Sequence, residues 1–348
     1  MDGDANQVWW PFRLARCSRG AWIAGGVAAL MGGCRCDKPK ATPPTLSASS
    51  AVARTAPAPR SSNAAADEPK VLLSLPFSAY QATIAIDEEA VYVLTNAALH
   101  RIVVGKTTEQ FPLDLGFGAT SSAHSILFWS EGAIWEVPKQ GGKAVRAGSV
   151  PHRPQTLVAS ANRFAWLDRS ETGEFTIQTL VGQKPKTIYS SPGRIDAATM
   201  SDDSVFFVER VDSLKWHIGR VTTTGRAAVF AQMRRGSPPA MLAAFEDHIY
   251  YQDPRARDVL RLSRDFQRED TLAKGLVCSP LAVWESVFCS RVEGLVEVFG
   301  DNRPPRPLLA NRRGELITAI AADAHRIAWL ADAGPDKLAV KVLSRTPP

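Results

Sequence analysis

The chain has 348 residues, of which 45% are hydrophobic and 22% charged, and this supply of apolar surface for a sizeable core excludes a wholly disordered protein. The formal net charge is +6, from 41 Lys and Arg against 35 Asp and Glu, and the cations are spread along the chain. A basic balance this mild and dispersed gives little support to nucleic-acid binding, so we expect no nucleic-acid partner.

The first 33 residues have the three parts of an export signal. A positive region ending at Arg19 precedes the apolar stretch 21–31, and two glycines then lead to Cys34. The apolar stretch is shorter than the about 20 residues that a membrane-spanning helix needs, so cleavage is favoured over a retained anchor.

The sequence Leu-Met-Gly-Gly-Cys at 30–34 resembles the bacterial lipobox, in which small residues precede a Cys that becomes lipidated and N-terminal. One departure is Met31, which holds the place usually taken by Leu; Cys36 follows Arg35 and fits the pattern worse. The resemblance implies export and a lipid anchor at Cys34, on the periplasmic or the surface side of the bacterial envelope. The alternative is an ordinary secretory signal with an incidental Cys.

Residues 34–69 predict a tether. The stretch after Cys34 is rich in Ala, Pro, Ser and Thr and nearly free of large apolar side chains. Such a segment cannot bury enough surface to offset the entropy of ordering it. We therefore expect the lipidated Cys and a disordered linker in this range, extended where Pro is dense.

From residue 70 onward the sequence repeats a short, strongly hydrophobic strand. Seven copies are visible, at 91–94, 126–129, 164–167, 205–208, 249–251, 287–289 and 327–330. Their starts are 35 to 44 residues apart, close to the ~40 to 45 residues of one four-stranded propeller blade.

Each copy is flanked by strands of different composition. Strands rich in Ala, Ser and Thr come before it, for example at 82–86, 119–122, 197–199, 241–244 and 318–322. Small residues suit the innermost strands of a propeller, which converge on a narrow channel. Alternating strands come after it, for example at 99–103, 134–137, 216–221, 259–262 and 338–342, and predict one buried and one wetter face.

The two ends of this region complete one another. The seventh unit stops after its third strand, and a lone strand at 71–75 comes before the first unit. We therefore predict an all-β fold for residues 70–348: a β-propeller of seven four-stranded blades, closed by the N- and C-terminal strands. A six- or eight-bladed ring, a β-sandwich and an open β-solenoid are the alternatives.

The copy at 126–142 resembles the repeats of YWTD-type and related secreted bacterial propellers. It has an aromatic pair, a Gly hairpin and the ending Val-Pro-Lys-Gln-Gly-Gly. Receptor propellers of this type usually have six blades, and the other copies match weakly. The resemblance implies the architecture only, because one fold of this kind serves many activities.

Two cysteines, Cys278 and Cys289, lie on consecutive predicted strands across a turn near residues 284–285. An exported compartment permits oxidation, but the turn pairs them diagonally. A disulfide and two buried thiols both remain open at this stage, and either role is structural.

Three histidines, His124, His248 and His325, precede hydrophobic strands of different blades. No set of acidic residues repeats beside them, so we interpret them as turn residues and predict no metal site. The acidic pairs at 202–203 and 246–247 are interpreted as turn formers too. We also predict no catalytic residue and no cofactor, because the familiar catalytic and phosphate-binding motifs are missing from the sequence.

The loops that join one blade to the next are basic. Cations fall in five of the seven junctions, at Arg153, Arg194, Arg234, Arg235, Lys274, Arg312 and Arg313. A ring of these side chains around one channel mouth would attract an anionic partner, such as a glycan, a carboxylate ligand or an acidic protein. The alternative is a set of solvated arginines that keep the protein soluble.

Three classes of function follow. The leading one is a non-catalytic binding or scaffold propeller, anchored to the envelope, with a protein or glycan partner. The second is an enzyme of the hydrolase or lyase type with a dispersed site at the channel mouth. The third is a sensor or a subunit of an envelope assembly complex.

Overall fold

The computed structural model describes residues 68–76, 82–113, 116–170, 172–301, 303–310, 315–334 and 337–345. In these ranges the chain is all-β, with 29 strands joined by turns and loops. The predicted signal at 1–33, the lipidation site Cys34 and nearly all of the predicted linker lie outside the described residues, as do Arg312 and Arg313.

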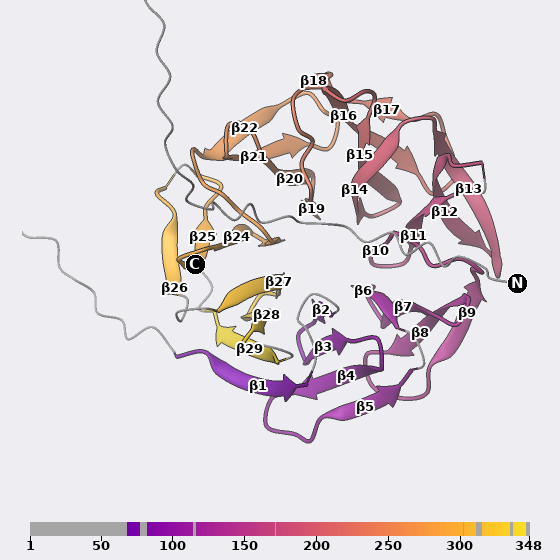
Figure 1. Cartoon of the computed structure of the whole chain (residues 1–348). Helices are drawn as coiled ribbons and strands as arrows, with labels where there is room; N and C mark the ends of the chain where they lie inside the picture. Colours follow the sequence, from indigo (N-terminus) through magenta and orange to yellow (C-terminus); the bar gives the residue numbers. More distant parts are fainter. Residues whose placement is uncertain are drawn as a thin grey trace, which may run out of the picture. The chain divides into compact units, whose positions relative to one another are not determined.

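The strands form seven antiparallel sheets that follow one another around a central channel (Figure 1). The first strand of each sheet packs beside the first strand of the next, and the last returns to the first. This is a closed seven-bladed β-propeller, as predicted; we number the blades from the sheet that contains β2.

In blades 1 to 6 the strands are arranged outward from the channel in chain order. The first strands are β2 (Thr83–Ile86), β6 (Phe117–Ser121), β10 (Thr156–Ala159), β14 (Arg194–Ser201), β19 (Leu242–Phe245), β23 (Leu281–Trp284) and β27 (Leu316–Ala322). The second strands, which contain the seven hydrophobic copies, are β3 (Ala90–Leu94), β7 (Ser125–Ser130), β11 (Phe164–Arg169), β15 (Ser204–Arg210), β20 (His248–Asp253), β24 (Ser286–Arg291) and β28 (Arg326–Asp332).

The outer half of each blade completes the sheet. The third strands are β4 (Ala98–Val103), β8 (Ala133–Pro138), β12 (Phe175–Val181), β16 (Lys215–Thr222), β21 (Asp258–Ser263), β25 (Gly294–Val298) and β29 (Leu338–Ser344). The outermost strands are β5 (Glu109–Pro112), β9 (Val145–Ser149), β13 (Lys184–Ser191), the pair β17 (Val229–Phe230) and β18 (Arg234–Arg235), β22 (Glu269–Ala273), β26 (Arg306–Ala310) and β1 (Lys70–Leu75).

The ring is closed by pairing strands from its two ends. β1 is the outermost strand of blade 7 and pairs antiparallel with β29, with Lys70 opposite Val342 and Leu75 opposite Leu338. Closure of this kind covers the sheet edge that β29 would otherwise expose. The predicted closure by the terminal strands is confirmed.

The hydrophobic core lies between blades rather than inside them. In β3, Val91 and Val93 pack in the cluster shared with blade 7, and Tyr92 and Leu94 pack in the cluster shared with blade 2. Side chains of a strand alternate between its faces, and here each face meets a neighbouring blade. The second strands are therefore buried on both faces, which explains their unbroken hydrophobic runs.

Two of the third strands, β4 and β29, differ from the prediction of a wetter face. Arg101 of β4 and Lys341 of β29 are only 8% and 9% exposed, because the next blade covers that face as well. Each cation has an acidic partner: Arg101 pairs with Glu109 at 3.2 Å, and Lys341 with Glu315 at 2.6 Å. Arg101 and Lys341 are thus paired inside the interface and do not face water.

Candidate functional site

The two ends of the channel carry different loops. Because successive strands of a blade are antiparallel, the turns between first and second strands and between third and fourth strands lie at one end, which we call the hairpin face. The loops that join blades and the turns between second and third strands lie at the other end, which we call the junction face.

A cavity of about 640 Å³ opens at the hairpin face, where turns from several blades meet at the channel. Its charged lining consists of Asp87, Glu88, Glu89, Lys139 and Asp323, and Trp284 adds a large apolar surface. A concave site with mixed apolar and polar walls is what a ligand needs for contact area and orientation.

Asp87 organises the turn of blade 1. Its Oδ1 accepts hydrogen bonds from the backbone N–H groups of Glu89 and Ala90, at 2.9 and 2.8 Å. Its Oδ2 accepts one from the Tyr92 hydroxyl at 3.0 Å. The carboxylate is thus held by its own hairpin, which is the usual role of Asp in a turn.

Asp323 has the same role in blade 7. Its Oδ1 accepts hydrogen bonds from the backbone N–H groups of His325 and Arg326, both at 2.7 Å. The Arg326 guanidinium pairs with Asp323 Oδ2 at 3.1 Å and also donates to the backbone carbonyl oxygen of Asp87. The cavity wall is therefore continuous across the joint between blades 7 and 1.

Lys139 brings a cation from blade 2 into the same wall. Its ammonium lies 3.9 Å from Asp87 Oδ2. Burial lowers the pKa of Lys139, and the negative charges of Asp87 and Glu88 oppose that shift. The backbone carbonyl oxygen of Lys139 accepts a hydrogen bond from Arg101 Nε at 2.9 Å. Both the backbone and the side chain of Lys139 therefore have a partner in the neighbouring blade.

The predicted cations have varied surroundings. Arg153 lies over the Phe117 ring, 3.9 Å from its centroid, and Arg194 pairs with Asp196 at 2.7 Å. Arg234 is in β18 at the outer edge of blade 4, where it pairs with Glu269 of blade 5. Arg235 and Lys274 are exposed.

Two of the three histidines lie in turns, as predicted, and the third lies in a strand. His124 and His325 are in the turns before β7 and β28, and His248 is the first residue of β20. Within the described ranges, no three His, Cys, Asp or Glu side chains gather as a metal ion would require.

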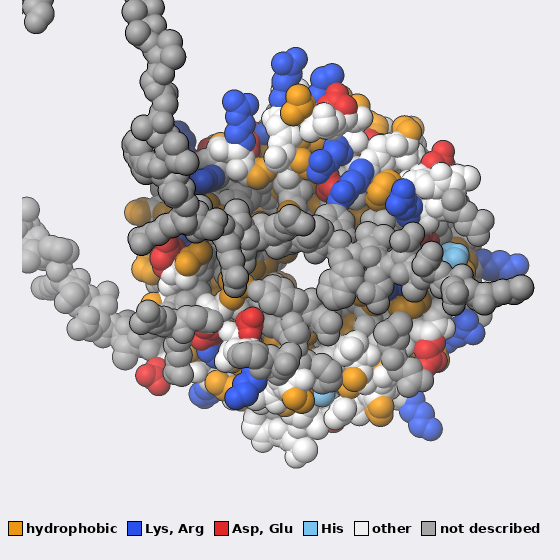
Figure 2. Space-filling view, viewed as in Figure 1, with side chains coloured by type: hydrophobic (Ala, Val, Ile, Leu, Met, Phe, Trp, Pro, Cys, Tyr) orange, Lys and Arg blue, Asp and Glu red, His pale blue; other side chains and the backbone are white. Residues whose placement is uncertain are grey.

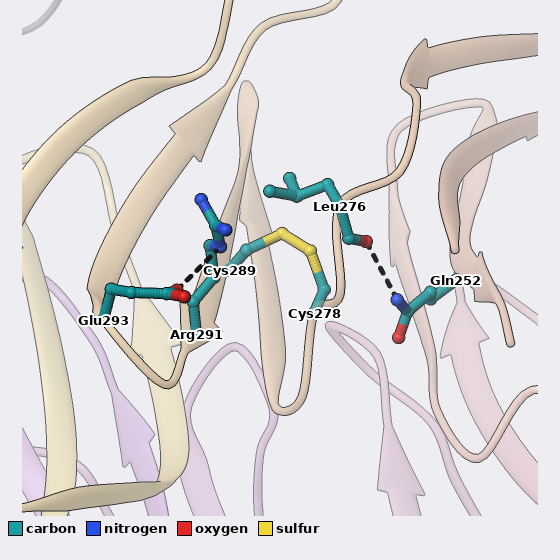
Figure 3. Close-up of a disulfide and its surroundings, with 6 residues drawn as sticks. All are labelled: Gln252, Leu276, Cys278, Cys289, Arg291 and Glu293. Atoms are coloured by element: carbon teal, nitrogen blue, oxygen red, sulfur yellow. Dashed lines mark hydrogen bonds and ion pairs between the residues drawn. A yellow bond between two sulfur atoms is a disulfide. The ribbon is translucent and has the colours of Figure 1, made fainter. Parts of the chain in front are cut away.

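Cys278 and Cys289 form a disulfide, with their Cα atoms 4.9 Å apart (Figure 3). Leu281, not Cys278, is the residue directly opposite Cys289 in the sheet, so the bond links the segment ahead of β23 to β24. Of the two alternatives left open by the sequence, the structure contains the disulfide.

Sequence reasoning missed the convergence of the turns. Asp87 and Asp323 are 236 residues apart, yet each lies three residues before the first residue of the second strand of its blade. Ser122 has the same place in blade 2, and its Oγ accepts a hydrogen bond from the N–H of Ser125 at 3.1 Å. This repeated capping position was the available signal. Aligning the seven units on it would have placed these residues together at one end of the channel.

Two solved structures, PorZ and YCF48, support the fold by their likeness to this chain. PorZ, a surface component of the type-IX secretion system of Porphyromonas gingivalis, matches with a TM-score of 0.54 and 12% identity over 79% of this chain and 39% of that chain. YCF48 bound to D1 peptide matches with a TM-score of 0.55 and 11% identity over 78% of this chain and 95% of that chain. BamB from Moraxella catarrhalis has a TM-score of 0.46, with 10% identity over 79% of this chain and 99% of that chain.

At such low identities these likenesses concern architecture alone. No protein-family model matches the chain, and no curated protein matches its sequence. Among the described residues there is no helix long and apolar enough to cross a membrane.

Proposed function

We propose that this protein is an exported, lipid-anchored β-propeller of the bacterial cell envelope that binds a protein partner without catalysing a reaction. In this proposal residues 1–33 are removed as a signal, Cys34 carries the lipid, residues 34–69 form the tether and residues 70–348 form the propeller. The small residues before Cys34 and the Pro- and Ala-rich stretch after it support the anchor.

The cavity at the hairpin face carries the proposal of binding. The carboxylates of Asp87 and Asp323 are held by backbone N–H groups of their own turns, and this favours a structural role for them over proton transfer. Glu88 is exposed at the same mouth, and Trp284 supplies apolar contact area. A partner segment that enters here would meet a rigid wall with both apolar and acidic groups.

The comparison structures agree with a role of this kind. One of them is a propeller in complex with a peptide, and another is a bacterial surface component of a secretion system. We extend the role to this chain as a proposal, in which the partner is a protein of the envelope and the complex is part of an envelope assembly.

Lipidation is tested by labelling cells with a fatty-acid analogue. The wild-type chain and a Cys36→Ala variant should take up label, and a Cys34→Ala variant should not. Equal label in the Cys34→Ala variant would reject the anchor.

Binding at the cavity is tested by photo-crosslinking in intact cells. A crosslinking side chain at Gln140, which lines the cavity and is exposed, should yield one protein adduct, and Glu88→Lys should lower its amount. The same side chain at Val181, exposed on the outer part of blade 3, serves as the control. If Gln140 gives no protein adduct beyond the control, the cavity is not the binding site.

A further inference from the structure

Four exposed cations lie together on the junction face around blade 5. They are Arg235, Arg255, Arg257 and Lys274, and none of the four pairs with a carboxylate of the described residues. Figure 2 shows Lys and Arg side chains gathered over the upper part of the ring, where Figure 1 shows β16, β18 and β21. We call these four residues, with Leu214 and Val277, the junction patch.

Contacts between loops show that the patch is continuous. The N–H of Gly236 donates to the carbonyl oxygen of Leu214 at 2.8 Å, which joins the end of β18 to the turn of blade 4. A methyl group added to Gly236 would lie 3.8 Å from Arg255 Cδ. The N–H of Gly275, next to Lys274, donates to Asp258 Oδ1 at 2.9 Å. The patch thus extends from blade 4 across blade 5 to the loop before blade 6.

The nearby carboxylates are occupied by backbone groups. Asp253 Oδ1 accepts from the N–H groups of Arg255 and Ala256, at 2.8 and 3.1 Å. Asp258 accepts from Gly275, as described above. Asp253 and Asp258 keep their negative charge and shape the turns, and among the described residues neither forms an ion pair with any of the four cations.

Apolar side chains accompany the charges. Leu214 is 66% exposed and Val277 is 48% exposed. In the loop 274–280, exposed Lys274 and Val277 alternate with buried Leu276 and Cys278. A surface that mixes unpaired cations with exposed aliphatic groups is complementary to an acidic segment that carries its own apolar residues.

The loop 274–280 is rigidly held. Gln252 Nε2 donates to the carbonyl oxygen of Leu276 at 2.9 Å, and the Cys278–Cys289 disulfide fixes the following residues to β24 (Figure 3). A loop that is already ordered loses little entropy when a partner binds. The disulfide therefore holds Lys274 and Val277 in position for docking.

We propose that the junction patch docks an acidic, leucine-containing segment of a protein partner. The alternative occupant is an anionic membrane surface. The proposed tether disfavours a membrane as the occupant. Lys70 lies opposite Val342, near the end of β29 that lies at the hairpin face. The chain therefore enters the propeller at the hairpin face, which is opposite the face that carries the patch. This orientation argument rests on the proposed function, whereas the charge and contact arguments do not.

The test uses the purified chain and two probes: a fluorescent 20-residue peptide of Glu and Leu, and vesicles with phosphatidylglycerol. The patch variant carries Arg235→Ser, Arg255→Ser, Arg257→Ser and Lys274→Ser. The control variant replaces four exposed cations of the hairpin face, Lys106, Lys143, Lys184 and Arg226, with Ser, so that both variants lose the same charge.

We expect the peptide to bind the wild-type chain, and its Kd to rise by about tenfold or more in the patch variant and by less than about twofold in the control. Raising the salt concentration should weaken wild-type binding more than patch-variant binding. A Cys278→Ser/Cys289→Ser variant should also bind the peptide more weakly. The near-ultraviolet circular dichroism of its aromatic side chains should match that of the wild-type chain, as evidence that the variant is folded.

Three results would overturn the proposal: no peptide binding, equal losses in the patch and control variants, or patch-dependent binding to the vesicles alone. None of them bears on the lipid at Cys34 or on the crosslink at Gln140, so a failure here is distinguishable from a failure of the proposed function.

Discussion

Leu73 of β1 lies opposite Val340 of β29, and both pack in the cluster between blades 7 and 1. Leu73→Asp places a carboxylate against this apolar cluster, so the free energy of unfolding should fall by about 1–3 kcal/mol. Urea unfolding followed by tryptophan fluorescence measures the change. Val71→Asp is the control, because Val71 is 57% exposed, and similar losses in the two variants would contradict the stabilising role of the closure.

The disulfide between Cys278 and Cys289 should stabilise the fold. The two residues are 11 apart in sequence, and closing a loop of this length restricts the unfolded chain by about 3 kcal/mol. The Cys278→Ser/Cys289→Ser variant should unfold at a correspondingly lower urea concentration. Reductant should shift wild-type unfolding toward the variant and leave the variant unchanged; a shift of the variant by reductant would point to another cause.

Glu297 of β25 is a buried carboxylate with several partners. It is 1% exposed and accepts from the Ser286 hydroxyl at 2.7 Å and from Arg306 Nε at 3.0 Å, while buried Arg345 lies 3.8 Å away. Glu297→Ala should lower the free energy of unfolding by about 3–5 kcal/mol, because it leaves buried polar groups without their partner.

Glu293, on the same blade, provides the comparison. It pairs with Arg291 at 3.3 Å in a largely exposed position, so Glu293→Ala should cost less than about 1 kcal/mol. Equal unfolding midpoints for the two variants would show that burial of Glu297 does not make it more important.

His100 makes stability depend on pH. It is buried in β4, its Nε2 has no hydrogen-bond partner among the described residues, and burial lowers its pKa. The unfolded chain then binds a proton more readily than the folded chain, so His100 contributes fully above the unfolded pKa of about 6.5. This contribution is lost as pH falls below that value toward the folded pKa.

The pH dependence can be assigned with two variants. His100→Gln should flatten the fall in unfolding free energy below pH of about 6.5, which for one group reaches at most about 1.4 kcal/mol per pH unit. His124→Gln, in an exposed turn, should leave the slope as it is. If both variants keep the wild-type slope, another group causes the dependence.

The fold could be predicted because its main pattern is local. Burial on both faces makes a second strand such as β15 an unbroken apolar run, and the run recurs once per blade. The closure by β1 could also be predicted, because the seventh unit lacks a fourth strand in sequence. The split of the outermost strand of blade 4 into β17 and β18 was not predicted.

The surroundings of side chains could not be predicted in the same way. Arg234 and Glu269 are 35 residues apart and meet only because neighbouring blades pack together. Arg234 is reached by a carboxylate of the next blade, whereas no ion pair of Arg255 is found among the described residues. This difference depends on how the blades pack and not on the sequence repeat. The turns of the hairpin face were interpreted one at a time, so their shared cavity was missed.

The pairing of Lys70 with Val342 brings the first residues of β1 close to the last residues of β29. A short peptide could join these positions, and a new start could be cut in an exposed turn such as that at Gly182. The permuted chain would have all its blades at the same places around the axis. For this protein, the order in which the blades are synthesised is separable from their arrangement in space.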